Sequence, residues 1–217
     1  MKLTLKIKRQ NSFETFEVPY KDGMTLLDAL NYIKEYIDPT LSYRQFCRAG
    51  ICGTCAVNVN GFPKLVCKEQ ALPYALDDTP VLLEPLSNAE VIKDLVVDTT
   101  SVMSSRIKSY KTWINPLSEN IKIEQELSRK IEEASDCILC YACQSFCPEV
   151  KDKDYGGPLF FAKLYKLFID PRDKDHSIRL LEAKETLILH CLSCNKCNNA
   201  CPKEVRPATL IRELLDT

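Results

Sequence analysis

The stretch CILCYACQSFCP, residues 137–148, contains four cysteines at the spacing C-x2-C-x2-C-x3-C, followed by a proline. The stretch CLSCNKCNNACP, residues 191–202, repeats this spacing and ends in a proline at the same place. The internal repeat is visible only at the cysteines. Thiols that are this dense and this regularly spaced are typical of metal binding, and they indicate how the second half of the chain folds.

This repeat has the spacing of bacterial two-cluster ferredoxins. In those proteins the first three cysteines of each run bind one [4Fe-4S] cluster, and the fourth binds the other. The pattern therefore predicts one cluster held by Cys137, Cys140, Cys143 and Cys201, and a second held by Cys191, Cys194, Cys197 and Cys147. Because this exchange connects distant segments, cluster assembly and folding of the second half should be coupled.

A third group of cysteines lies near the N-terminus. Its spacing is C-x4-C-x2-C with a fourth cysteine further on, which is the plant-type arrangement for a [2Fe-2S] cluster. Two glycines in the loop allow the tight curl that directs several thiolates at one small cluster. The predicted ligands are Cys47, Cys52, Cys55 and Cys67.

Zinc is the alternative to iron-sulfur clusters. A four-thiolate zinc site could use Cys137, Cys140, Cys191 and Cys194, but it would leave four equally regular cysteines unused. The twelve cysteines instead divide into three sites of four with none remaining. Iron-sulfur binding is therefore the favoured interpretation.

Composition limits the class of protein. The 29 Lys and Arg residues nearly balance the 30 Asp and Glu residues, so no overall positive field favours nucleic acid as a partner. The first residues alternate apolar and charged side chains, unlike a secretory signal, and no run of about 18 apolar residues occurs. We therefore expect a cytoplasmic protein, held at a membrane only through partner subunits, in which thiols stay reduced and bind metal.

The order of predicted elements indicates an α+β protein with two domains. Alternating apolar residues predict a hairpin over residues 3–20, and Thr25 with Asp28 predicts a capped helix that follows it. Further strands are expected around the turn at Asn60-Gly61 and in TPVLLEPL. Beyond residue 90 we expect only helices, in AEVIKDLVVDTTSVMSSRIKSY, GPLFFAKLYKLFI and PATLIRELL. The boundary is placed at residue 97, which gives domains 1–97 and 98–217.

Taken together, these motifs resemble the iron-sulfur subunit of succinate dehydrogenases and fumarate reductases. The motifs occur in that family's order and at roughly its spacing, over most of the chain. They are FCRAGICGTCAVNVNG, VIKDLVVD, DCILCYACQSFCP, GPLFFAKLYKLFIDPRD and CPKEVRPATLIREL. The resemblance implies an N-terminal β-grasp ferredoxin domain followed by an α-helical ferredoxin domain.

The resemblance also implies the function. Such a subunit carries electrons between an FAD-containing flavoprotein, where succinate and fumarate interconvert, and a quinone site formed with membrane subunits. The catalytic site is then on another chain. By position, the [2Fe-2S] cluster should lie nearest the flavin, the cluster of Cys137, Cys140, Cys143 and Cys201 in the middle, and the remaining cluster distal.

Cys194 departs from the family pattern. Most members have an aliphatic residue at this position, which leaves the distal cluster three ligands and makes it [3Fe-4S]. A fourth thiolate here predicts a [4Fe-4S] cluster, or [3Fe-4S] if Cys194 is not a ligand. The alternative role is a small apolar residue that fills space.

Two further departures concern the electron partner. PEVKDKDYGG follows Cys147 where quinone-reducing members have a tryptophan-bearing segment, and Leu192 stands where many have histidine. Both changes weaken the case for the usual quinone pocket. Together with Cys194 they indicate a cysteine-rich partner like those of heterodisulfide reductases, or a thiol or methylated-quinone donor. The expected third subunit thus links the chain to a membrane quinone or to a thiol donor. The alternative function is a soluble electron carrier or a subunit of a heterodisulfide-reductase-type or glycolate-oxidase-type oxidoreductase.

Overall fold

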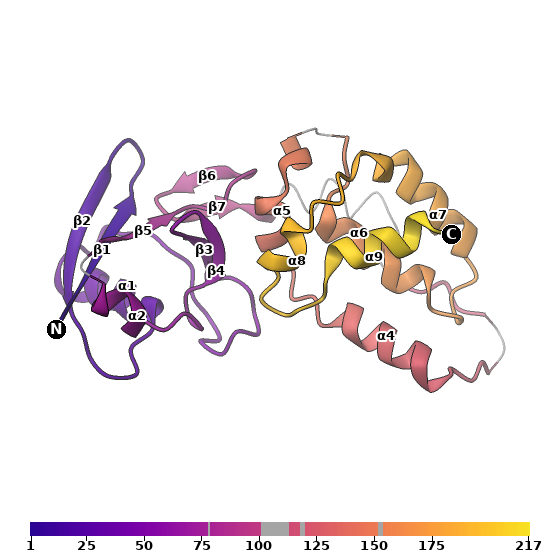
Figure 1. The fold of residues 1–217 in the computed structure, drawn as a ribbon, viewed down its shortest axis with the longest axis horizontal. Coiled ribbons are helices and arrows are strands. Elements are labelled where there is room, and N and C mark those ends of the chain that lie inside the picture. The colour runs from indigo at the N-terminus through magenta and orange to yellow at the C-terminus, as the bar shows by residue number, and fades with distance from the viewer. Residues whose placement is uncertain (78, 101–112, 118–119, 152–153) are drawn as a thin grey trace. The chain divides into compact units, whose positions relative to one another are not determined.

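The computed structural model describes residues 1–77, 79–100, 113–117, 120–151 and 154–217. The chain forms two compact units. One contains Met1–Thr99 and the short stretch Ile138–Ala142, and the other contains Thr100–Cys137 and Cys143–Thr217. The first unit holds the sheet and the second is helical, as the order of elements in Figure 1 shows.

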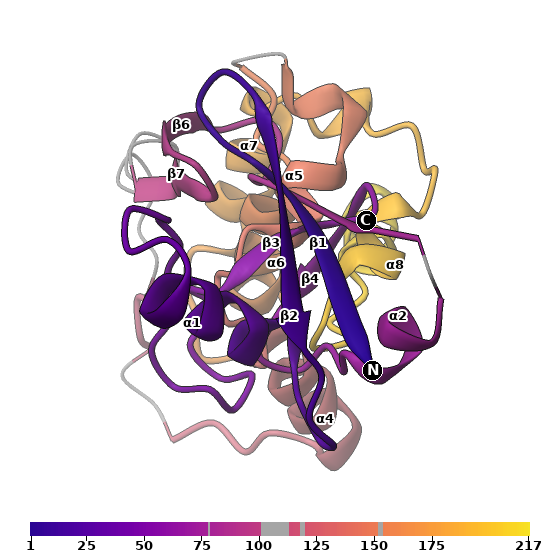
Figure 2. The same ribbon diagram turned by 90° about the vertical axis from the view of Figure 1, so that its left-hand side faces the viewer.

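The first unit is built on a five-stranded sheet with the strand order β2-β1-β5-β3-β4. Strands β1 and β2 are antiparallel, β1 and β5 are parallel, and β3 is antiparallel to both of its neighbours. Figure 2 shows the long β1–β2 hairpin. The strands are β1 (Lys2–Lys8), β2 (Phe13–Pro19), β3 (Ala56–Val59), β4 (Phe62–Leu65) and β5 (Val81–Glu84).

Helix α1 (Leu26–Tyr36) begins at the predicted capping box. The Thr25 hydroxyl accepts the Asp28 N–H, and the Asp28 carboxylate accepts the Thr25 N–H at 2.9 Å. Its apolar face contributes to the core of the first unit together with the inward residues of β1. A short helix, α2 (Leu72–Leu76), follows the β3–β4 hairpin. The predicted N-terminal elements are confirmed, with Asn60 (φ 50°) and Gly61 (φ 78°) forming the β3–β4 turn.

The helix predicted to start at residue 89 was wrong for its first part. Residues in this stretch form a two-stranded antiparallel sheet of β6 (Glu90–Lys93) and β7 (Val96–Asp98). Asp94 takes a left-handed conformation (φ 48°), and its buried carboxylate accepts hydrogen bonds from Arg9 Nε at 3.0 Å and Ser42 N at 2.9 Å. These contacts hold a turn where the helix was expected. The rest of that prediction, over 101–110, lies outside the described residues.

The second unit packs around α6, whose apolar side chains form its core. Phe161 is fully buried, and Phe160, Leu164 and Tyr165 are nearly so. Helices α4, α7 and α9 contact α6. The elements are α4 (Gln125–Ser135), α5 (Ala142–Phe146), the 3-10 helix η1 (Pro148–Lys151), α6 (Pro158–Phe168), α7 (His176–Glu185), the 3-10 helix η2 (Ile188–His190), α8 (Lys196–Ala200) and α9 (Pro207–Leu215).

A buried ion pair on the segment before and within α7 fixes the residues that precede α4 to the rest of the second unit. Arg179 and Asp173 are both fully buried, and Arg179 Nε donates to Asp173 Oδ2 at 3.0 Å. Asp173 Oδ1 accepts the N–H of Asn115 at 3.0 Å, and Arg179 Nη2 donates to the carbonyl of Trp113 at 3.1 Å. Removing Arg179 would leave the buried carboxylate of Asp173 without this ion pair.

Candidate iron-sulfur centres

The loop between α1 and β3 curls around Cys47. Its sulfur accepts backbone N–H groups from Ala49 at 3.4 Å, Ile51 at 3.3 Å and Cys52 at 3.2 Å. Gly50 (φ 68°) supplies one of the left-handed backbone angles that the curl requires. The N–H groups of Ala49, Cys52 and Ile51 lower the pKa of the Cys47 thiol to about 6. The loop is therefore built to hold a thiolate, which is the form that binds iron.

Cys55 and Cys67 lie at the open end of the β3–β4 hairpin. Both are buried, and the Val66 N–H donates to the Cys55 carbonyl at 3.3 Å. Burial raises the pKa of the Cys55 thiol to about 12, and Cys67 and Cys52 are close enough to contribute. The hairpin thus brings Cys67 back against the cysteine loop, and the four predicted thiols of the [2Fe-2S] site belong to one part of the first unit.

Cys140 also belongs to the first unit, through the stretch Ile138–Ala142. It lies against Gly53 of the cysteine loop, where an added Cβ would be 2.8 Å from Cys140 Cβ. In the same stretch, the hydroxyl of the fully buried Tyr141 donates to the Asn88 carbonyl at 2.6 Å. One predicted ligand of the middle cluster therefore packs beside the predicted [2Fe-2S] loop.

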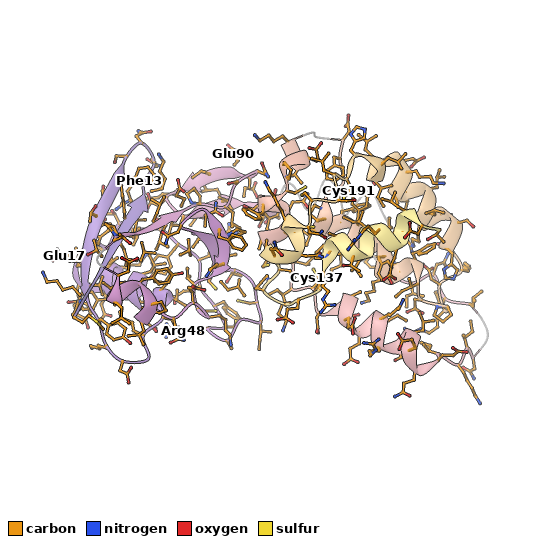
Figure 3. The ribbon with its side chains drawn as sticks, in the orientation of Figure 1. Phe13, Glu17, Arg48, Glu90, Cys137 and Cys191 are labelled. Carbon is orange, nitrogen blue, oxygen red and sulfur yellow. The ribbon has the colours of Figure 1, made fainter. Side chains whose placement is uncertain are left out.

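The other predicted ligands of the middle cluster lie in the second unit. Cys143 is buried on α5, and Cys137 and Cys201 pack against the hydrophobic core (Figure 3 labels Cys137). The Cys201 sulfur accepts the N–H of Val205 at 3.4 Å. The binding of one cluster by Cys137, Cys140, Cys143 and Cys201 stays a prediction.

The four cysteines predicted for the distal cluster line one small, mainly apolar cavity. Burial raises the pKa of Cys197 to about 12 and raises that of Cys147, and in both cases Cys191 and Cys194 are close enough to add to the shift. Cys194 is exposed, so it does not fill space in the core. The second run and the fourth cysteine of the first run therefore converge.

Tyr155 completes this cavity, and no motif in the sequence singled it out. Only 1% of its surface is exposed, and it lines the cavity beside Cys191. Burial raises the pKa of Tyr155, and Cys191 and Cys147 raise it further. A tyrosine that precedes two glycines is a weak signal by itself, because its contact with Cys191 exists only in the folded chain.

The donor sets fit iron-sulfur clusters. Across the described ranges, no three His, Cys, Asp or Glu side chains are arranged to hold a single metal ion. In a cluster, several iron and sulfide ions separate the protein ligands. The backbone N–H groups around Cys47 and the grouped thiols of the distal cavity match that chemistry.

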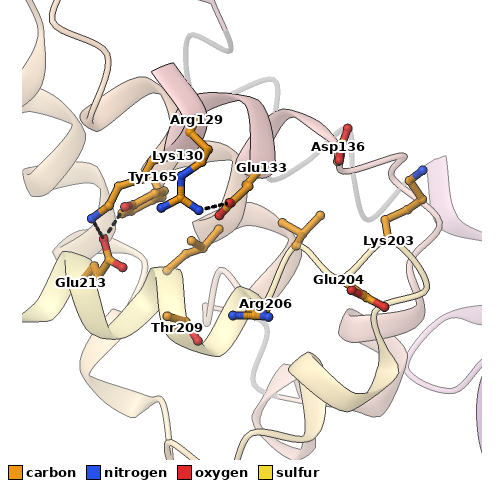
Figure 4. A pocket seen from close by; sticks show the side chains of 12 residues that line it. Arg129, Lys130, Glu133, Asp136, Tyr165, Lys203, Glu204, Arg206, Thr209 and Glu213 are labelled. Atoms are coloured by element: carbon orange, nitrogen blue, oxygen red, sulfur yellow. Dashed lines mark hydrogen bonds and ion pairs between the residues drawn. The ribbon is translucent and has the colours of Figure 1, made fainter. Parts of the chain in front are cut away.

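A second cavity, of about 490 Å³, lies among α4, α6 and α9 and is lined mainly by charged side chains (Figure 4). Arg129 pairs with Glu133 at 3.0 Å, and Lys130 pairs with Glu213 at 3.4 Å. Tyr165 also donates to Glu213. None of its lining residues is a cysteine.

Among the residues that the structure describes, no helix has both the length and the apolar character needed to span a bilayer.

Comparison with known proteins gives matches over both halves. A family model described as a 2Fe-2S iron-sulfur cluster binding domain matches residues 4–104, and one described as a 4Fe-4S dicluster domain matches residues 132–205. The fumarate reductase iron-sulfur subunit of Mycobacterium tuberculosis is 36% identical, over 95% of this chain and 86% of that protein.

Two further matches are to a longer relative and to a solved structure. A fumarate reductase (CoM/CoB) subunit from Methanothermobacter marburgensis is 32% identical over 93% of this chain, which spans only 40% of that relative's length. Among solved structures, a chain of the Mycobacterium smegmatis Sdh1 complex in the apo form matches with a TM-score of 0.91 at 24% identity. The match covers 99% of this chain and 94% of that one, and it shows the same fold.

Proposed function

The chain belongs to the family of iron-sulfur subunits of succinate dehydrogenases and fumarate reductases, and on that premise we propose that its twelve cysteines hold three clusters in a relay. One [2Fe-2S] and two [4Fe-4S] clusters supply one-electron transfer when they are bound. The relay connects an FAD-containing flavoprotein, where succinate and fumarate interconvert, with a third subunit. The observation that carries the proposal is the convergence of four thiols on the distal cavity.

The protein's own contribution is to hold and tune the thiolates. Three N–H groups directed at Cys47 favour its charged form. Hydrogen bonds of this kind offset the negative charge that a reduced cluster acquires, so they raise its reduction potential. At Cys55 and Cys197 burial outweighs the backbone hydrogen bonds and raises the pKa of the thiol, so ionisation of these thiols is coupled to metal binding.

Cys194 is the fourth ligand of the distal cluster in this proposal. Its place on the cavity beside Cys147, Cys191 and Cys197, together with its exposure, supports a ligand role. A distal [4Fe-4S] cluster usually has a lower potential than a three-iron cluster, although burial and hydrogen bonds also tune it. The distal centre would then suit a partner of lower potential than the usual quinone.

The electron partner in this proposal is a cysteine-rich third subunit linked to a thiol donor, with a membrane quinone as the second candidate. The fumarate reductase relative named for CoM/CoB supports the thiol donor. The segment after Cys147 and the exposed Leu192 replace the features of the usual quinone pocket. We place the complex in the cytoplasm, at the inner face of the membrane where the partner is membrane-bound.

Purification of the complex through a tag on this chain tests the proposal. We expect a flavoprotein to co-purify, about ten irons per chain, and succinate oxidation or fumarate reduction with artificial electron carriers. A matched preparation with Cys52→Ser should keep the flavoprotein but lose the [2Fe-2S] signal. An iron-containing preparation without flavin and without either activity would favour the soluble carrier or another oxidoreductase. The family matches do not favour that alternative.

A further inference from the structure

Packing around its aromatic ring holds the side chain of Tyr155 in place. The side chain is almost completely buried, and its ring packs against Phe161 with the centroids 5.5 Å apart and the planes at 60°. Phe161 is itself fully buried and packs edge-on against Phe160 at 5.4 Å. The phenol ring therefore has neighbours on the core side that prevent it from turning away from the cysteines.

The backbone after Tyr155 is fixed as well. The N–H of Gly156 donates to the Thr186 carbonyl at 2.9 Å, and the Gly156 carbonyl accepts from Gln144 Nε2 at 3.1 Å. Gln144 Oε1 accepts the N–H of Leu159 at 3.2 Å, at the start of α6. Because Gln144 is itself buried, this clamp holds residues 156–159, which follow Tyr155 on the wall of the distal cavity.

Tyr155 lines the distal cavity together with the four cysteines predicted to bind the distal cluster. Only 1% of the Tyr155 surface is exposed, so its hydroxyl needs a hydrogen-bond partner inside the protein. The groups that share this cavity with it include the sulfurs of Cys147, Cys191 and Cys197, and all three add to the effect of burial in raising the pKa of Tyr155, Cys191 the most of the three. A phenol near several thiolates acts as the donor, because the sulfurs carry the negative charge.

We propose that Tyr155 is a positioning residue that raises the reduction potential of the distal cluster by donating its hydroxyl hydrogen to the sulfur of Cys191. This inference rests on the proposed function, since it requires a cluster at this cavity. Reduction adds negative charge to the cluster and its sulfurs, so the hydrogen bond is stronger in the reduced state. Tyr155 thereby partly offsets the lower potential that the fourth thiolate, Cys194, brings.

The test is a potentiometric titration of the intact complex, followed by electron paramagnetic resonance, with Tyr155→Phe. Loss of one charge-assisted hydrogen bond should lower the equilibrium constant for reduction of the distal cluster about tenfold, which is 59 mV for one electron. Tyr165→Phe is the matched control, because Tyr165 is as buried but donates to Glu213. It should leave the distal potential unchanged, and the [2Fe-2S] potential should be the same in both variants.

A second substitution keeps the inference testable if the Tyr155→Phe variant does not assemble into the complex. Site-specific 3-fluorotyrosine at position 155 keeps the shape of the ring and makes the hydroxyl a stronger donor, so the distal potential should rise. A distal potential unmoved by both substitutions, in protein with full iron content, would overturn the inference and leave the relay intact. Wild-type protein without any distal cluster would instead overturn the proposed function.

Discussion

Gly157→Ala should destabilise the second unit through a side chain in another element. Gly157 precedes α6 with φ 85° and ψ 165°, a backbone region open almost only to glycine. An added Cβ would lie 2.6 Å from Cδ of Gln144, which is far inside van der Waals contact. Gln144 is buried and cannot swing into solvent, so its amide must leave the hydrogen bonds to the Gly156 carbonyl and the Leu159 N–H.

The size of the effect follows from two contributions. The backbone conformation costs an alanine about 1–3 kcal/mol. Each of the two hydrogen bonds of the clamp leaves a buried group unsatisfied when it breaks, at about 1–3 kcal/mol each. The variant should therefore lose at least about 3 kcal/mol, which for a chain of this length lowers the melting temperature by at least about 6 °C.

A double-mutant cycle separates these contributions. Wild type, Gly157→Ala, Gln144→Ala and the double variant are each loaded with clusters, and the melting temperature is followed by visible circular dichroism at one scan rate. In the Gln144→Ala background there is no amide to displace, so Gly157→Ala should cost at least about 4 °C less than in wild type. An equal cost in both backgrounds would refute the reasoning.

Two further substitutions test other parts of the structure. Arg179→Met should destabilise the protein by about 3–5 kcal/mol, measured as a lowered melting temperature, because it leaves the buried Asp173 without its partner. Gly53→Ala should cost about 1–3 kcal/mol more than Gly23→Ala, since only at Gly53 (φ 72°) would the new Cβ meet Cys140. Gly23 has nearly the same φ, 73°, and nothing within 4 Å, and early loss of the [2Fe-2S] spectrum on heating is the measurement.

The controls define what would contradict these two predictions. Arg129→Met removes two solvent-exposed ion pairs on α4, so it should leave the melting temperature almost unchanged. Equal melting temperatures for Arg129→Met and Arg179→Met would contradict the role assigned to the buried pair. Equal behaviour of the Gly53 and Gly23 variants would show that the backbone angle alone matters.

Cysteine spacing and strand periodicity were the most informative parts of the sequence. The spacing C-x2-C-x2-C-x3-C encodes local curls, so it could point to convergent thiols before any tertiary contact was known. The hairpin β1–β2 and the cap of α1 are likewise local, because alternation and the Thr25–Asp28 pair act over a few residues. The structure shows these elements where the sequence placed them.

The sequence did not predict the features that depend on contacts between residues far apart in the chain. VIKDLVVD has apolar residues at a spacing that suits a helix or two strands, and the turn at Asp94 depends on Arg9, which lies 85 residues away. Tyr155 is similar, since its role depends on a clamp from Gln144 and a sulfur at Cys191. Local patterns do not carry such contacts, and the tertiary structure overrides the local preference.

Cys194 offers the most direct test of the relay. The measurement is electron paramagnetic resonance with iron analysis of the anaerobically purified complex, for wild type and Cys194→Ser. We expect about ten irons per chain and no three-iron signal in the wild type, and a [3Fe-4S] signal after air oxidation of Cys194→Ser. An isotropic three-iron signal from undamaged wild-type protein, unchanged by the substitution, would contradict the account.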